Sequence, residues 1–96
     1  MYKLRFSTTL APTYKLLIKG NKEFEKRTAK ALRQLKTDPF YPSLKSHKVN
    51  TRNFGEKWSS WITGDLRIIW DFDKDTQQII LLFAVAKHSG SHKEYK

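Results

Sequence analysis

The fold is decided by residues 58–85, which read WSSWITGDLRIIWDFDKDTQQIILLFAV. Over 66–72, every second side chain from Leu66 onward is apolar, and we expect this row to face the core. The side chains between them form the other row, on the opposite face. A period of two is typical of a β-strand with one buried face. Residues 58–63 form a second strand pattern, and Gly64-Asp65 supplies a turn between the two. The two patterns together predict an antiparallel hairpin.

A third strand is predicted over 79–85, where the continuous apolar run indicates a central strand buried on both faces. Asp73-Lys74-Asp75 makes the preceding turn, so the three strands form an antiparallel meander. We expect the three tryptophans of this region to pack in the core or on a sheet face rather than to stack on bases. They are Trp58, Trp61 and Trp70.

Upstream of the meander, the sequence predicts one strand and two helices. Residues 2–6 alternate as in a short strand. Pro12 suits the first turn of a helix that Gly20-Asn21 ends. A second helix is expected over 22–35, before Asp38-Pro39 interrupts it. Its apolar face carries Phe24, Thr28, Ala31, Leu32 and Leu35. Two short helices joined by a tight turn form an αα-hairpin.

These elements predict one α+β domain over residues 1–96. The N-terminal strand completes a four-stranded sheet with the three-stranded meander, and the αα-hairpin covers one face. The polar residues 46–57 are expected to form a loop.

Composition restricts the classes of function. The 96 residues contain 19 Lys and Arg against 9 Asp and Glu, a formal net charge of +10 that favours nucleic acid or an acidic protein as the partner. The absence of cysteine excludes disulfides and thiolate metal sites. The longest apolar run, 79–86, is too short to span a bilayer, and the N-terminus lacks the core of a signal peptide. We therefore expect a cytoplasmic protein without membrane attachment, metal or cofactor.

The candidates for chemistry are polar residues around the predicted sheet. All three histidines, His47, His88 and His92, lie in polar, basic segments. Cleavage of RNA without a metal needs a base for the 2′-hydroxyl proton, an acid for the leaving 5′-oxygen, and a cation beside the phosphate. Histidine suits the first two roles because it ionises near neutrality. Arg67 suits the third because arginine is always charged and binds phosphate with two N–H groups.

Simpler interpretations stay open for each candidate. Histidines near a C-terminus are more often exposed to solvent than catalytic. His88 and His92 have the spacing of two zinc ligands on a helix, although Ser89-Gly90-Ser91 disfavours a helix there. Arg67 on a strand has Asp71 as a possible ion-pair partner.

The order of these features resembles the RelE/ParE toxin superfamily, and most closely its RelE/YafQ-like mRNA interferases. The resemblance covers nearly the whole chain. It rests on Asp38-Pro39, on PSLKSHK at 42–48, on WITGDLRIIW at 61–70 and on GSHKEY at 90–95. It implies a compact domain of two helices packed on an antiparallel sheet.

The resemblance also implies the site. His47 matches a catalytic histidine, Asp65 a catalytic acid in the turn, and Arg67 a phosphate-binding arginine. His92 matches a general acid or base, and Tyr95 a terminal aromatic that contacts the substrate. His88 stands where related nucleases tend to carry arginine, so the division of acid and base roles stays open. The basic residues expected to hold the RNA backbone are Lys45, Lys48, Arg52, Lys57, Lys87 and Lys93.

The sequence therefore predicts the toxin of a type II toxin–antitoxin system, a metal-independent endoribonuclease that cleaves mRNA on the ribosome and inhibits translation. Its products would carry 2′,3′-cyclic phosphate or 3′-phosphate ends. Two alternatives stay open: a ParE-like poison of DNA gyrase and a non-catalytic nucleic-acid-binding module. ParE-like members generally lack the nuclease histidines. The implied protein partner is an acidic or amphipathic antitoxin that folds across the basic sheet face or the helical hairpin.

Overall fold

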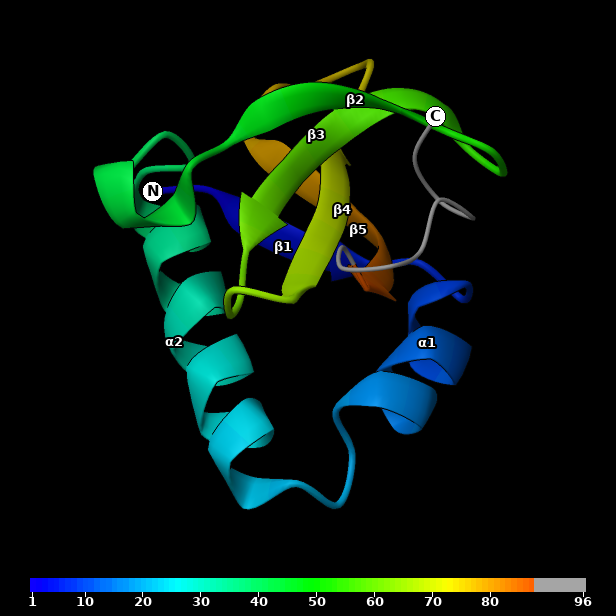
Figure 1. Cartoon of the computed structure of the whole chain (residues 1–96). Helices are drawn as coiled ribbons and strands as arrows, with labels where there is room; N and C mark the ends of the chain where they lie inside the picture. Colours follow the sequence, from blue (N-terminus) through cyan, green and yellow to red (C-terminus); the bar gives the residue numbers. More distant parts are fainter. Residues whose placement is uncertain (88–96) are drawn as a thin grey trace.

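The computed structural model describes residues 1–87 of the chain. It has an α+β architecture in which one strand and two helices precede a run of four strands (Figure 1). In chain order the elements are β1 (Lys3–Phe6), α1 (Leu10–Leu17), α2 (Lys22–Thr37), the 3₁₀ helix η1 (Pro42–Leu44), β2 (His47–Thr51), β3 (Gly55–Trp61), β4 (Leu66–Phe72) and β5 (Ile79–Lys87). The predicted α+β class is confirmed, and so is the order in which one strand and two helices precede the antiparallel strands.

The sheet has five strands in the order β1-β5-β4-β3-β2. β1 pairs in parallel with β5, and the other neighbouring pairs are antiparallel. The apolar run 79–85 was predicted to form a central strand, and β5 does lie inside the sheet between β1 and β4.

The prediction of a loop over residues 46–57, and with it the count of four strands, was wrong. This segment forms β2 and the start of β3, with Val49 opposite Lys57 and Thr51 opposite Gly55. The Thr51 hydroxyl closes the turn, because it donates to the carbonyl of Gly55 at 2.8 Å and accepts from the N–H of Phe54 at 3.0 Å. β2 is an edge strand with mostly exposed side chains, so it carries little of the apolar alternation that identifies buried strands.

Both helices lie on one face of the sheet (Figure 1). There they form one core cluster with the sheet, to which α1 contributes Leu10 and α2 contributes Ala31 and Leu35. Trp70 is fully buried in this core. The ring of Trp58 stacks on it at a centroid distance of 5.7 Å, which confirms a packing role for both side chains.

The other face of the sheet, called the open face below, carries a smaller apolar cluster. Ile69, Ala84 and Ala86 are buried there, with the partly buried rings of Phe54 and Phe83 packed against them. Neither α1 nor α2 lies on this face (Figure 1). None of the helices in residues 1–87 is long and apolar enough to cross a membrane.

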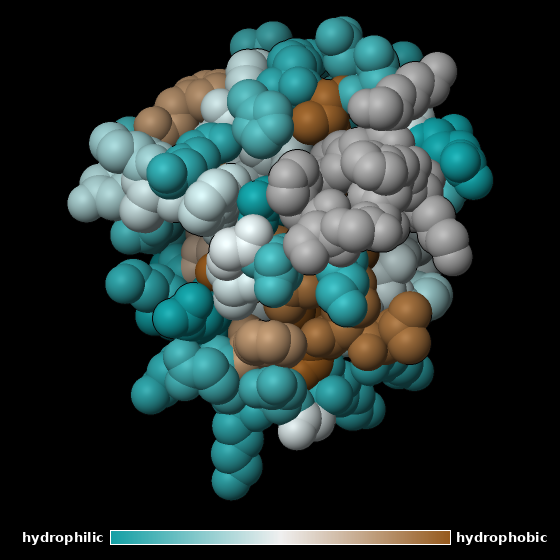
Figure 2. All heavy atoms as spheres, viewed as in Figure 1, coloured by the Kyte–Doolittle hydropathy of each residue, from teal (hydrophilic) through white to brown (hydrophobic). Residues whose placement is uncertain are grey.

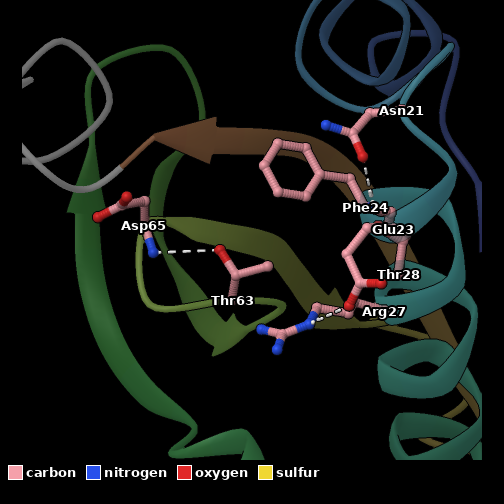
Figure 3. A network of polar contacts seen from close by, with 7 residues as sticks. All are labelled: Asn21, Glu23, Phe24, Arg27, Thr28, Thr63 and Asp65. Carbon is pink, nitrogen blue, oxygen red and sulfur yellow. Dashed lines mark hydrogen bonds and ion pairs between the residues drawn. The ribbon is translucent and has the colours of Figure 1, made fainter.

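The connection between the helices is fixed by local hydrogen bonds. Gly20 has φ +90°, a left-handed conformation that glycine adopts without strain. Asn21 then caps α2, its side-chain oxygen accepting from the N–H of Phe24 at 3.0 Å (Figure 3). The amide of Gly20 donates to the carboxylate of Glu25 at 3.0 Å. The expected start of the second helix at Lys22 is confirmed, and the helix continues to Thr37.

We expect Asn21→Ala to lower the free energy of unfolding by about 1 kcal/mol, because the first turn of α2 loses its side-chain acceptor. Asn21→Asp keeps the acceptor and places a negative charge at the positive end of the helix dipole, so its stability should stay close to that of the wild type. Urea denaturation followed by circular dichroism measures both. Equal loss in the two variants would contradict the capping role.

Candidate active site

Four strand ends meet at one end of the sheet. β2 begins at His47 and pairs there with Ser59 of β3. β3 ends at Trp61, opposite Arg67 of β4. The first residue of β4 is opposite Lys87, the last residue of β5. Residues that are far apart in sequence are therefore brought together at this end.

Strand alternation decides which side chains at this end project onto the open face. Directly opposed residues of an antiparallel pair share a face, and so do residues two apart on one strand. Arg67 shares a face with Ile69, which belongs to the open-face cluster. Trp61 is opposite Arg67, and His47 is opposite Ser59. His47, Trp61 and Arg67 therefore lie on the open face.

The hydrogen bond of His47 determines which ring nitrogen is available for chemistry. Its Nδ1 atom lies 3.0 Å from the carbonyl oxygen of Lys45. A carbonyl only accepts, so Nδ1 carries the hydrogen, and in the neutral ring Nε2 keeps its lone pair. The His47 side chain is exposed. This arrangement presents a proton acceptor to a molecule bound on the open face.

Arg67 is a buried cation that holds the β3–β4 turn. Only 4% of it is exposed. Its Nη1 atom donates to the carbonyls of Thr63 at 2.7 Å and Gly64 at 2.9 Å, with the carbonyl of Leu66 at 3.2 Å. Burial removes water from the guanidinium, and these carbonyl dipoles stabilise its positive charge instead. The structure thus fixes the guanidinium beside the turn, which the sequence pattern alone did not indicate.

Trp61 brings two cations to the same place. The Arg67 guanidinium carbon lies 4.3 Å from the centroid of its ring, and Lys45 Nζ lies 4.6 Å from it. Lys45 follows η1 and has φ 49°, a left-handed conformation that is uncommon for a side-chain-bearing residue. Trp61 packs on the sheet face as predicted, but its cation contacts were missed. The shared face of positions 61 and 67 was the signal that would have indicated them.

Asp65 is exposed at the tip of the β3–β4 turn. Its N–H and that of Leu66 both donate to the Thr63 hydroxyl, each at 3.1 Å. The carboxylate points away from Thr63 and from α2 (Figure 3). The turn places Asp65 at the same end of the sheet as His47, with its side chain directed to solvent.

The basic residues expected to hold RNA divide between different surfaces. Lys57 lies on the open face, where its Nζ is 3.6 Å from the carboxylate of Asp71. Lys48 faces the other way, and its Nζ lies 5.1 Å from the centroid of the Trp58 ring. Arg52 is exposed in the β2–β3 turn, and Lys87 is exposed at the end of β5. The structure therefore places Lys48 apart from the open face.

The remaining predicted site residues lie outside the described residues. They are His88, His92, Lys93 and Tyr95. Within residues 1–87 no group of three or more potential ligands is placed to hold a metal ion. The chemistry that the described site supports is therefore built from His47, Arg67 and their neighbours.

No protein-family model matches the sequence, and no curated protein matches it. Solved structures share its fold. The YoeB/ParE toxin from Agrobacterium tumefaciens is 17% identical with a TM-score of 0.69, over 90% of this chain and 98% of that chain. YafQ from E. coli strain BL21(DE3) is 13% identical with a TM-score of 0.67, over 91% and 93%. A chain of the heterotetrameric YoeB–YefM toxin–antitoxin complex from Staphylococcus aureus is 18% identical with a TM-score of 0.66, over 92% and 98%.

These similarities extend over nearly the full length of each chain, so they concern the whole domain rather than a shared motif. The two helices on one face of the sheet and the open opposite face are thus those of a known class of small proteins. The chain therefore shares its fold with the YoeB/ParE toxin and with YafQ.

Proposed function

We propose that this protein is the toxin of a type II toxin–antitoxin system and acts as a metal-independent endoribonuclease on mRNA. The observation that carries the proposal is the position of His47. Its Nδ1 is occupied by the Lys45 carbonyl, and its Nε2 is left to act as a base on the face that carries Arg67. RNA cleavage by internal attack needs this pair of groups beside an accessible surface.

In the proposed reaction, Nε2 of His47 takes the proton from a 2′-hydroxyl. The resulting oxygen attacks the adjacent phosphorus, and the bond from phosphorus to the 5′-oxygen breaks. The exposed Lys45 supplies positive charge next to the phosphate as negative charge accumulates on its oxygens, and the buried Arg67 adds its charge from within the sheet face. A second histidine, His92 or His88, donates a proton to the leaving 5′-oxygen. The products are a 2′,3′-cyclic phosphate and a 5′-hydroxyl.

The charge of the protein supports a polyanionic substrate. With a formal net charge of +10, the chain attracts RNA over a range of about 10 Å at moderate salt. The basic side chains on or beside the open face then hold the phosphodiester backbone. Translating ribosomes carry mRNA at high local concentration, so we propose ribosome-bound message, in the cytoplasm, as the substrate.

The proposed protein partner is an antitoxin. The YoeB toxin of Staphylococcus aureus, which has the same fold, forms a heterotetrameric complex with YefM. For this chain we propose a partner with an acidic, amphipathic segment, because such a segment complements the basic surface and folds on binding.

We expect the purified protein to cleave RNA in the presence of a chelator, because every group in the proposed reaction belongs to the chain. Cleavage is measured on gels with and without translating ribosomes, and the new ends are identified by mass spectrometry. Ends with 2′,3′-cyclic phosphate or 3′-phosphate support the mechanism, and His92→Gln tests the proton donor. Activity that disappears only when metal is removed would contradict it.

A second assay on the same purified protein tests the alternative that it is a gyrase poison with the same fold. Supercoiling by DNA gyrase is measured beside RNA cleavage. Inhibited supercoiling with intact RNA would replace the nuclease proposal, since fold alone does not determine activity.

A further inference from the structure

Two adjoining hollows run along α2 on the side of the molecule where it approaches η1 and the β3–β4 turn. Their volumes are about 330 and 400 Å³, and Lys30 and Gln34 line both. The first extends to Trp61 and the turn, and the second extends to Tyr41. Because they share Lys30 and Gln34, the two neighbouring hollows are together called the α2 groove below.

The three cations of the α2 groove lie at successive positions around the helix, with Arg27 and Arg33 about 120° apart about its axis. Arg27 lines the first hollow, Arg33 lines the second, and Lys30 lies between them. The Arg27 side chain points from α2 toward the β3–β4 turn (Figure 3). Figure 2 shows that the surface over α2 is hydrophilic. Positions 27 and 33 are six residues apart, or about 9 Å along the helix axis and about 120° around it, so a chain that contacts both cations passes obliquely across α2.

Acidic groups near the groove are already engaged. Glu23 pairs with Arg27 at 3.0 Å, and both side chains are more than half exposed, so this pair is weak and screened. Asp38 lines the second hollow, where its carboxylate accepts from the N–H of Phe40 at 3.0 Å. Three cations against one lining carboxylate make the groove a site for a polyanion rather than for a cation.

Neutral groups of the groove match the rest of a nucleotide. The Ser43 hydroxyl donates to Gln34 Oε1 at 2.7 Å, which orients the amide and leaves its N–H groups to donate elsewhere. The aromatic residues of the lining are Trp61 in the first hollow and Tyr41, 46% exposed, in the second. Basic side chains interleaved with aromatic rings are the usual composition of single-strand binding grooves.

Trp61 connects the groove to the candidate active site. It lines the first hollow, and its ring also makes cation–π contacts with Lys45 and Arg67 at the end of the open face. A strand that leaves the open face past Trp61 therefore reaches the first hollow of the α2 groove.

We propose that the α2 groove is a second binding site, which takes the backbone of single-stranded RNA beyond the cleaved bond. This inference rests on the proposed function for the identity of the polyanion. Phosphates contact Arg27, Lys30 and Arg33, and unpaired bases contact Tyr41 and Trp61. Long substrates use the groove, and substrates that end at the open face do not.

The test compares two double variants of the full chain that lose the same charge on the same helix. Lys30→Gln/Arg33→Gln removes two groove cations. Lys22→Gln/Lys26→Gln removes two exposed lysines that do not line the groove. Fluorescence anisotropy measures binding of 2′-O-methyl RNA of about four and about twelve nucleotides, which lacks the attacking hydroxyl and stays intact. Thermal melts establish that both variants are folded.

We expect the groove variant to bind the long oligonucleotide about five- to tenfold more weakly, with a salt slope smaller by about 1.4, as for two lost phosphate contacts. Its affinity for the short oligonucleotide should change less than twofold, and the control variant should change little with either. If both variants bind the long oligonucleotide equally weakly, the groove proposal is wrong, and binding depends on the overall positive charge of the protein rather than on a defined site.

Two further results distinguish the groove from the proposed function. If the wild type cleaves RNA and the two double variants bind the long oligonucleotide equally well, the groove proposal is wrong and the nuclease proposal stands. Groove-dependent binding without any cleavage by the wild type overturns the nuclease proposal and keeps the groove. If the groove variant keeps its RNA affinity but loses a co-expressed antitoxin, the site is a protein interface and the inference is wrong.

Discussion

Replacement of His47 by glutamine is expected to lower RNA cleavage by a factor of about 10² to 10⁴, the usual contribution of a positioned general base or acid. Glutamine retains a hydrogen-bonding side chain but offers no nitrogen that takes up a proton. His47 is exposed at the start of an edge strand, so its replacement should leave the fold intact. Single-turnover cleavage on a defined RNA measures the loss.

The next residue along the chain provides the matched control. Lys48 is also polar and exposed on β2, but it faces the opposite side of the sheet and lies against Trp58. Lys48→Gln should therefore keep cleavage within about threefold of the wild type, a change attributable to one distant charge. A loss as large as that of His47→Gln would mean that RNA does not lie on the open face.

Measurement of RNA affinity shows whether His47 acts in the cleavage step or in RNA binding. If His47 acts as a base, His47→Gln binds 2′-O-methyl RNA with nearly wild-type affinity while its cleavage rate falls, because the lost interaction belongs to the transition state. A variant that loses affinity and rate together would instead make His47 an RNA-binding residue, and the base would have to be sought elsewhere.

The buried strands could be predicted from the sequence because burial leaves a periodic trace. Leu66, Ile68 and Trp70 alternate toward the helices. The continuous apolar run in β5 belongs to a strand inside the sheet that contributes Ile80 and Leu82 to the helix-side core and Ala84 to the open-face cluster. The hairpin formed by β2 and β3 left no such trace. The side chains of β2 are mostly exposed at the sheet edge, and the hydroxyl of Thr51, not an apolar pattern, closes the turn between β2 and β3.

The candidate site was predicted in composition but not in geometry. His47 and Arg67 were identified as residue types with suitable chemistry, yet the sequence gives no sign that Arg67 is buried against three carbonyls of its own turn. Likewise, Lys48 and Lys57 are equivalent as charges in a sequence. Only the pairing register of β2 with β3 places them on opposite faces. Such features depend on tertiary contacts rather than on local pattern.

The second large effect concerns stability and centres on Trp70. Its ring is fully buried, stacks on Trp58 and meets Phe72 edge-on at a centroid distance of 5.2 Å. Its Nε1–H donates to the hydroxyl of Ser60 at 2.7 Å, and that hydroxyl also bonds Ser46 at 2.6 Å. Trp70 is thus connected through the buried Ser60 hydroxyl to the partly buried Ser46, in the segment before β2.

Trp70→Ala is expected to lower the free energy of unfolding by about 3 to 5 kcal/mol, because it leaves a large cavity and removes the donor to Ser60. For a domain of this size the midpoint of thermal unfolding should fall by at least about 12 °C. Trp70→Phe fills most of the cavity but lacks the N–H, so it should cost clearly less, and the difference between the two reports the packing contribution. As a surface control, Leu16→Ala should cost little, because Leu16 is 81% exposed. A loss below about 1 kcal/mol for Trp70→Ala would contradict the tight packing around the ring, since well-packed cores do not tolerate so large a deletion.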